Sequence, residues 1–323
     1  MTDWAAAETT LEANRPCFIC GCEDSEARFR PDVSRWGHGD PFVMRRCSGC
    51  GLVFNSPRLP VDRLADLYRR NYYFFARPAA LELERIGGAY LRTVAHLPPG
   101  RPGRLLEVGS AKGYMLGLLR ELGWEVAGVE IAETAAEHSR RRFGVEVFTG
   151  TLEEFGRHGS REFDVVLVQD VLEHVPAPGA FFNTLYQSVG PGGRLIIDTP
   201  NVGGRSVKAV GERWRGFNPF HIYLFDRDTL TRAAVNAGFS VELIGSYSDI
   251  VPEQSVIGAS APTTPPRGPA VTRLRGMVRS AVERTLLPHY LRQAARRARQ
   301  GPPHPLDPNC PGDNLVCIAV RPG

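Results

Sequence analysis

Four of the seven cysteines form two pairs with the same spacing, and both pairs lie within the first fifty residues. Each pair has the form CxxC and is followed by a glycine. Four thiolates suit tetrahedral Zn²⁺, and a closed four-sulfur site leaves no coordination position for chemistry. We therefore expect a structural zinc ion that folds a segment too poor in apolar residues to bury its own core. The expected ligands are Cys17, Cys20, Cys47 and Cys50. Cys22 is a spare that could replace Cys20, although the matched spacing favours Cys20.

A second group of residues lies where an expected strand turns into a helix, in the run Leu105-Leu-Glu-Val-Gly-Ser-Ala-Lys-Gly-Tyr114. Small residues at such a turn let the backbone approach a ligand closely. Glu130 ends the next expected strand, seventeen residues after Gly113. A carboxylate at this place can accept hydrogen bonds from both hydroxyls of an adenosine ribose, so the pattern indicates a nucleotide-type ligand.

Two further runs of residues narrow the class of nucleotide-binding protein that the sequence resembles. They are Phe163-Asp-Val-Val-Leu-Val-Gln-Asp-Val-Leu-Glu-His-Val175 and Pro191-Gly-Gly-Arg-Leu-Ile-Ile197. Together with Glu107 directly before the glycine loop, they resemble the class I S-adenosylmethionine (SAM)-dependent methyltransferases. The added CxxC pairs make the chain similar to the branch with an N-terminal zinc-binding region, which includes deoxysugar and other small-molecule methyltransferases.

The resemblance implies a cofactor role for residues along the carboxyl ends of the expected strands. The loop from Gly109 to Gly113 would wrap the methionine part of SAM, and Glu130 would bind the ribose. Thr151 and Leu152 would flank the adenine, and Gln169 and Asp170 would close the pocket. The complete expected set is Glu107, Gly109, Ser110, Gly113, Tyr114, Glu130, Ile131, Thr151, Leu152, Gln169 and Asp170.

The sequence departs from the family pattern at two positions. Ala111 replaces the usual middle glycine, a change that we expect to be tolerated if this position keeps a negative φ, since alanine adds only a methyl group. Thr151 stands where the family often carries an acid for the adenine amino group, so a hydroxyl or a backbone carbonyl would have to substitute.

Two histidines are candidate general bases, because their usual pKa suits proton removal from an acceptor hydroxyl near neutral pH. His174 and His221 both follow expected strand ends, and we favour His221. A histidine that merely packs within the aromatic loop 214–223 is the competing interpretation, as is a helix-capping role for Glu173 and His174. Nearby, Trp214, Phe217 and Tyr223 could form an acceptor wall or simply the loop core. We also expect Asn201 to reach the acceptor.

The elements that position these residues follow from the apolar pattern. Short apolar runs at 104–108, 125–129, 145–148, 163–169 and 194–198 alternate with helical patterns, which predicts an α/β fold. We expect a doubly wound, mostly parallel, seven-stranded Rossmann-like sheet with an N-terminal zinc-ribbon-like module, and last strands at 240–244 and 314–320. The expected domains are a zinc module (1–58), a helical linker and lid (59–98), the catalytic domain (99–248 with 314–323) and a Pro/Arg-rich insertion (249–313).

Composition limits the partners. The net charge is only +4, so it does not favour a nucleic-acid or membrane partner, and it does not identify the substrate. The resemblance implies a small-molecule acceptor, such as a sugar or a nucleotide-linked compound. No run reaches the roughly 18 apolar residues of a membrane helix, and cysteine usage indicates a cytoplasmic protein. The leading interpretation is methyl transfer to a small molecule or glycan precursor, with oxygen as the favoured acceptor atom and carbon or nitrogen as the alternatives. The alternatives are an RNA- or protein-directed methyltransferase that binds a polymer through its zinc ribbon and the arginine-rich tract 273–299, and an inactive SAM-binding protein.

Overall fold

The computed structural model describes residues 16–33, 42–62, 64, 89–159, 161–248, 287–298 and 305–323. These residues fall into two compact units. The first unit holds the described residues up to 64, then 151–248 and 306–323. The second holds 89–150, 287–298 and 305. No helix among the described residues is long and apolar enough to cross a membrane.

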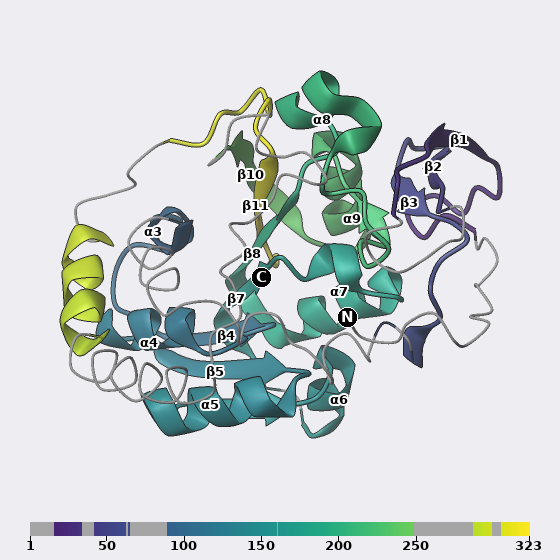
Figure 1. Ribbon diagram of the computed structural model, residues 1–323. Coiled ribbons are helices and arrows are strands. Elements are labelled where there is room, and N and C mark those ends of the chain that lie inside the picture. Colours follow the sequence, from purple (N-terminus) through teal and green to yellow (C-terminus); the bar gives the residue numbers. More distant parts are fainter. Residues whose placement is uncertain are drawn as a thin grey trace, which may run out of the picture. The chain divides into compact units, whose positions relative to one another are not determined.

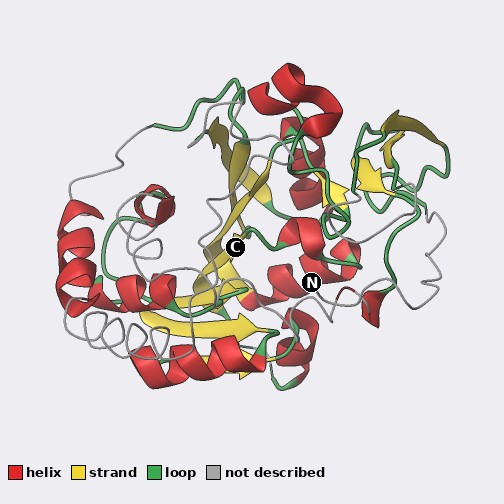
Figure 2. Ribbon diagram, in the orientation of Figure 1, coloured by secondary structure: helices red, strands yellow, loops and turns green. Residues whose placement is uncertain are grey.

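A seven-stranded sheet in the order β10-β11-β8-β7-β4-β5-β6 confirms the expected fold class (Figures 1 and 2). Its strands are β4 (Arg104–Val108), β5 (Glu125–Glu130), β6 (Glu146–Thr149), β7 (Phe163–Gln169), β8 (Val189–Pro200), β10 (Ser240–Tyr247) and β11 (Asn314–Val320). The pairs β4–β5, β5–β6 and β7–β8 are parallel, whereas β11 runs antiparallel to both β8 and β10. The carboxyl ends of the parallel strands therefore carry the predicted site residues.

The second unit contains β4, β5 and β6 with the helices α3 (Ala89–Val94), α4 (Tyr114–Glu121) and α5 (Glu133–Phe143). Leu105 and Leu106 of β4 and Leu116 and Leu118 of α4 have no exposed surface, so they form its core. Residues 287–298 are helical, and the remainder of the arginine-rich tract lies outside the described residues. Of the expected linker helices, only 61–62, 64 and 89–97 are described, so that prediction stays open.

The first unit contains β7, β8, β10 and β11 with their helices. These are α6 (Leu152–Arg157), α7 (Pro178–Ser188), α8 (Arg205–Val210), α9 (Arg227–Asn236) and the short 3₁₀ helices η3 (Leu172–His174) and η4 (Gly211–Arg213). Strand β8 begins five residues before the expected start because Val189 already pairs with Phe163 ahead of a register shift. A positive φ at Gly192 accompanies this irregularity.

The same unit includes the cysteine-bearing segment, whose sheet has the order β1-β2-β3-β9. Figure 1 shows β1 (Ser25–Phe29), β2 (Met44–Cys47) and β3 (Val53–Asn55) side by side. The fourth strand, β9 (Tyr223–Leu224), comes from the segment after β8, where the sequence indicated only a loop. The described part of the expected zinc module, residues 16–33 and 42–58, therefore shares a sheet with the region that carries His221.

Candidate functional site

The glycine loop after β4 has three residues with positive φ. Gly109 lies at φ 76° and Gly113 at φ 78°, conformations that glycine adopts at little cost. Ala111 lies at φ 46°, so the condition of a negative φ, under which alanine was expected to be tolerated here, is not met. Its N–H donates to Glu130 Oε2 at 2.8 Å, and this hydrogen bond to a carboxylate helps to hold the left-handed conformation despite the extra methyl group.

The Glu130 side chain accepts hydrogen bonds from the backbone that follows β4 and from the backbone that follows β5. Its other oxygen, Oε1, accepts a hydrogen bond from the N–H of Ala132 at 2.8 Å, and only 2% of the residue is exposed. Burial raises the pKa of the Glu130 carboxyl, while these N–H groups act in the opposite direction. Each carboxylate oxygen has a second lone pair, so Glu130 can still accept hydrogen bonds from a ligand hydroxyl.

Side chains around the loop differ in what they offer a ligand. Ser110 is 3% exposed, and its Oγ has no hydrogen-bond partner within the described part of the chain. Ile131, which directly follows Glu130, is 41% exposed. Its side chain therefore offers an apolar surface to a flat ring. Tyr114 is buried and packs its ring against Phe143 of α5, with ring centroids 5.4 Å apart. Glu107 is also buried.

Two glycines of this unit are required by packing. A Cβ at Gly113 would lie 2.0 Å from Ser139 Oγ, and one at Gly128 would lie 2.7 Å from Ser110 Oγ. Close approach of α4 to α5 and of the loop to β5 therefore explains why these positions lack side chains.

In the first unit, the remaining predicted cofactor residues lie at the ends of strands and helices. Thr151 caps α6, since its Oγ1 accepts a hydrogen bond from the N–H of Glu154 at 3.2 Å. Leu152, the next residue, is buried. Gln169 ends β7, and Asp170 follows it at φ 51°, a conformation that is strained for a residue with a side chain. These cofactor assignments stay predictions.

The two candidate bases, His174 and His221, lie together. Their ring centroids are 4.8 Å apart with the planes at 73°. His174 Nδ1 lies 3.0 Å from the carbonyl oxygen of Phe220, and His221 Nδ1 lies 2.8 Å from that of Gly216. A carbonyl can only accept, so each Nδ1 carries the hydrogen and each Nε2 is the unprotonated nitrogen. Burial lowers the pKa of His174, and burial beside His174 lowers the pKa of His221 well below its ordinary value. Both rings are therefore neutral near pH 7.

Glu173 completes this cluster. It is 1% exposed, and one potential ligand atom from each of Glu173, His174 and His221 lies within 4.8 Å of the others. The hydroxyl of Thr199 donates to Glu173 Oε2 at 2.9 Å, and Glu173 Oε1 lies 3.7 Å from His174 Nε2. Burial and the nearby Asp170 raise the pKa of the Glu173 carboxyl well above its ordinary value. Burial of this carboxyl was not predicted, because a charged residue followed directly by a histidine in a short turn is usually exposed.

The other residues that were expected to contact the acceptor pack against the protein itself. Asn201 is buried, and its Nδ2 donates to the carbonyls of Cys310 and Gly312, so the expectation that it reaches the acceptor is not supported. Trp214 and Phe217 are 4% and 0% exposed and belong to one apolar cluster, which makes them loop core. Tyr223 packs partly buried, edge-on to Phe18.

The four cysteines of the CxxC pairs converge. Cys17 Sγ lies 3.5 Å from Cys50 Sγ, Cys20 Sγ lies 3.5 Å from Cys47 Sγ, and all four sulfurs lie within 4.8 Å of one another. Zn–S bonds of about 2.3 Å in a tetrahedron separate the sulfurs by about 3.8 Å, so the arrangement fits the ion. Backbone N–H groups of Ile19 and Cys20 point at the Cys17 sulfur. The Sγ of Cys22 instead donates to the carbonyl of Asp24, outside the cluster.

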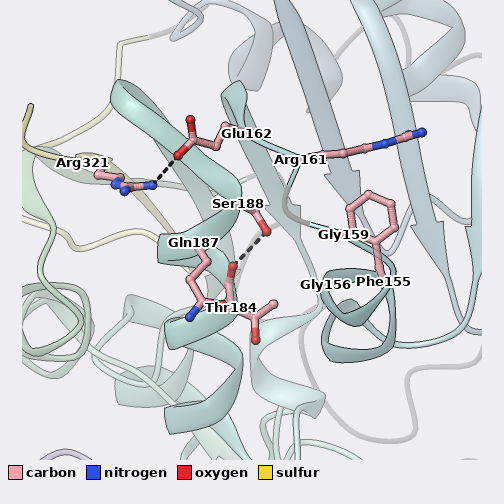
Figure 3. A pocket seen from close by; sticks show the side chains of 9 residues that line it. All are labelled: Phe155, Gly156, Gly159, Arg161, Glu162, Thr184, Gln187, Ser188 and Arg321. Carbon is pink, nitrogen blue, oxygen red and sulfur yellow. Dashed lines mark hydrogen bonds and ion pairs between the residues drawn. The ribbon is translucent and has the colours of Figure 1, made fainter.

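A pocket of about 410 Å³ lies elsewhere in the first unit (Figure 3). Its lining includes Phe155, Thr184 and Ser188, and Arg321 pairs with Glu162 at 3.2 Å beside it. Because Glu162 directly precedes β7, this pocket lies at the amino end of that strand, whereas Asp170 and His174 follow its carboxyl end. It is not the predicted site.

Comparison with known proteins identifies the class. A family model described as "Methyltransferase domain" matches residues 82–244. A ubiquinone biosynthesis O-methyltransferase of Caulobacter sp. (strain K31) is 36% identical over 180 residues, which are 53% of this chain and 66% of that protein. A probable S-adenosylmethionine-dependent methyltransferase of Mycobacterium tuberculosis is 32% identical over 214 residues, 65% of this chain and 70% of the relative.

Among solved structures, a SAM-dependent methyltransferase of Thermotoga maritima, described as a possible histamine N-methyltransferase, has a TM-score of 0.50 at 17% identity. The match covers 80% of this chain and 99% of that one, and it shows the shared fold. The chain spans less than two thirds of the length of some relatives, such as 56% of a probable SAM-dependent methyltransferase of Mycolicibacterium smegmatis.

Proposed function

Because the chain belongs to the methyltransferase-domain family, we propose that it transfers a methyl group from SAM to a hydroxyl oxygen of a small-molecule or glycan-precursor acceptor. The observation that carries the oxygen acceptor is the pair of neutral histidines, His174 and His221, beside the buried Glu173. A hydroxyl needs a base to become a good nucleophile, and an unprotonated Nε2 is such a base. The name of the Caulobacter relative, an O-methyltransferase, agrees with this choice.

The residues around the glycine loop fit the cofactor. The orphaned Ser110 hydroxyl, the exposed face of Ile131 and the spare lone pairs of Glu130 offer polar and apolar contacts that a nucleoside uses. SAM supplies an already activated methyl group, so the protein's task is to orient the acceptor and exclude water. The remaining predicted cofactor residues, including Gln169 and Asp170, are part of this proposal.

His221 is the proposed base. Its Nδ1–H is held by the carbonyl of Gly216, which orients Nε2 as the atom that takes the proton from the acceptor hydroxyl. Its lowered pKa keeps the ring neutral before the transfer. His174 is the second candidate, because its ring contacts that of His221 and its Nδ1–H is held in the same way.

The proposal also includes a structural zinc ion bound by the four clustered cysteines. The sulfur spacing and the N–H groups that point at Cys17 fit a four-thiolate site. Such a closed site would stabilise the fold of the cysteine-bearing segment and take no part in methyl transfer.

Turnover with methyl-labelled SAM tests the proposal, with catechol and a nucleotide-linked sugar as the two acceptor probes. We expect His221→Asn to lower kcat by about 10²- to 10⁴-fold while SAM affinity stays unchanged. His158→Asn is the matched control, because His158 is exposed at the end of α6. A wild-type kcat in His221→Asn would remove His221 from the base role. SAM binding without labelled product from either probe would reject these acceptor classes.

A further inference from the structure

The cysteine-bearing segment, residues 16–33 and 42–58, shares backbone hydrogen bonds with the segment around His221. Strand β3 pairs with β9 through Val53 with Leu224 and Phe54 with Tyr223. The N–H of Asn55 donates to the carbonyl of Ile222 at 2.8 Å, which continues the ladder to the residue after His221. A two-residue strand has almost no stability alone, so β9 depends on β3 for its conformation.

Side chains on both faces of this ladder are buried together. One apolar cluster joins Phe42 and Leu59 to Phe220 and Ile222, the two neighbours of His221. A second cluster joins Met44 and Val53 of the cysteine-bearing segment to Trp214, Phe217 and Leu224. Phe220, the most exposed of these residues, has only 7% of its surface accessible. Burial of this extent makes the His221 segment part of the same core as the cysteine-bearing segment.

Ile222 is also held from its other side. Its N–H donates to the carbonyl of Glu173 at 2.7 Å, while its carbonyl accepts from Asn55. Arg58 adds a second link, since its Nη1 donates to the carbonyl of Pro176, two residues after His174. The backbone next to His221 is therefore fixed between β3 and the turn that carries Glu173 and His174.

The strands of the cysteine-bearing segment are only five, four and three residues long. Cys47 is the last residue of β2, and the turn that it begins leads directly into β3. Cross-linking of the two CxxC turns would fix this β2–β3 hairpin, and a segment of this size normally needs such a link.

We propose that the zinc site positions His221: with the ion bound, β3 is ordered and holds the segment from Trp214 to Phe225 in place for proton removal. This inference rests on the zinc and base assignments of the proposed function. Loss of the ion should release the segment and lower kcat, whereas SAM affinity should persist because the glycine loop and Glu130 are held by contacts within residues 104–150.

The test uses the full chain and three variants. Cys47→Ser removes one proposed ligand, and Cys22→Ser is the matched control, because Cys22 lies outside the four-sulfur cluster. Asn55→Pro keeps all the cysteines but removes the N–H that binds Ile222. Zinc content is measured by mass spectrometry, SAM affinity by calorimetry, and backbone order by hydrogen exchange of peptides covering 214–225 and 104–130.

We expect Cys47→Ser to lose zinc and to exchange at least about 10-fold faster in 214–225, with 104–130 and the SAM Kd unchanged. Asn55→Pro should retain zinc and still exchange faster around residues 221–224, and Cys22→Ser should match the wild type. A zinc-free variant whose 214–225 segment exchanges at the wild-type rate would overturn the inference. So would loss of SAM binding, because the zinc site would then hold the whole fold. Wild-type protein that binds no zinc would instead refute the zinc assignment of the proposed function.

Discussion

Replacing Ala111 by glycine should stabilise the protein, although glycine usually destabilises. Ala111 lies at φ 46°, where the side chain of an L-residue costs about 1 to 2 kcal/mol. Glycine removes that cost, but its greater conformational freedom in the unfolded state lowers the free energy of unfolding by about 0.4 to 1 kcal/mol. The hydrogen bond from this residue to Glu130 Oε2 uses only the backbone N–H, so it survives the change. From the middle of each range, the net gain in the free energy of unfolding is about 0.8 kcal/mol.

Urea unfolding of the full chain measures this gain, and the melting temperature should rise by about 1 to 4 °C. Ala136→Gly serves as a control of opposite sign, because Ala136 lies within helix α5 and should lose about 1 kcal/mol. SAM affinity should be retained, since the loop conformation is unchanged. A lower free energy of unfolding for Ala111→Gly would refute the left-handed conformation and, with it, the described hydrogen bond to Glu130.

Three other variants test single contacts. In Glu173→Gln, a neutral side chain replaces a carboxyl whose pKa is raised by burial. The stability that such a carboxyl contributes is fully present below its unfolded pKa of about 4.3 and is lost as the pH rises through the folded value. Between about pH 5 and about pH 8, the free energy of unfolding from urea titrations should therefore fall less in the variant than in the wild type. Equal decreases would contradict the raised pKa. Asn55→Leu should raise the free energy of unfolding by about 1 to 3 kcal/mol, because the buried Asn55 amide has no hydrogen-bond partner among the described residues. Asn218→Leu is the matched comparison and should be destabilised, since the Asn218 side chain accepts from two backbone N–H groups. Gly113→Ala should lower the melting temperature sharply, as its Cβ would meet Ser139 Oγ at 2.0 Å, and Ser139→Gly in the same chain should restore part of the loss.

Much of the fold was predictable because its signals are local. The apolar runs of β4, β5 and β7 and the CxxC spacing each lie within a few residues, so the sheet and the cysteine cluster follow from short-range patterns. The φ of Ala111 was not predictable in this way. It depends on a carboxylate nineteen residues further along the chain, whereas residues with a side chain usually adopt a negative φ.

The position of His221 depends on contacts that no local pattern reveals. Strand β9 has two residues, and its partner β3 lies about 170 residues earlier, so neither its length nor its composition distinguishes it from a loop. The one available signal was the run of large apolar residues on both sides of His221, which has too many buried side chains for a solvated loop. Such a run within a presumed loop predicts a buried partner elsewhere in the chain, and the cysteine-bearing segment is one that is too poor in apolar residues to bury a core of its own. Because neither segment can bury its apolar side chains alone, the two segments fold against each other. This packing explains why a candidate base is held by a candidate metal module.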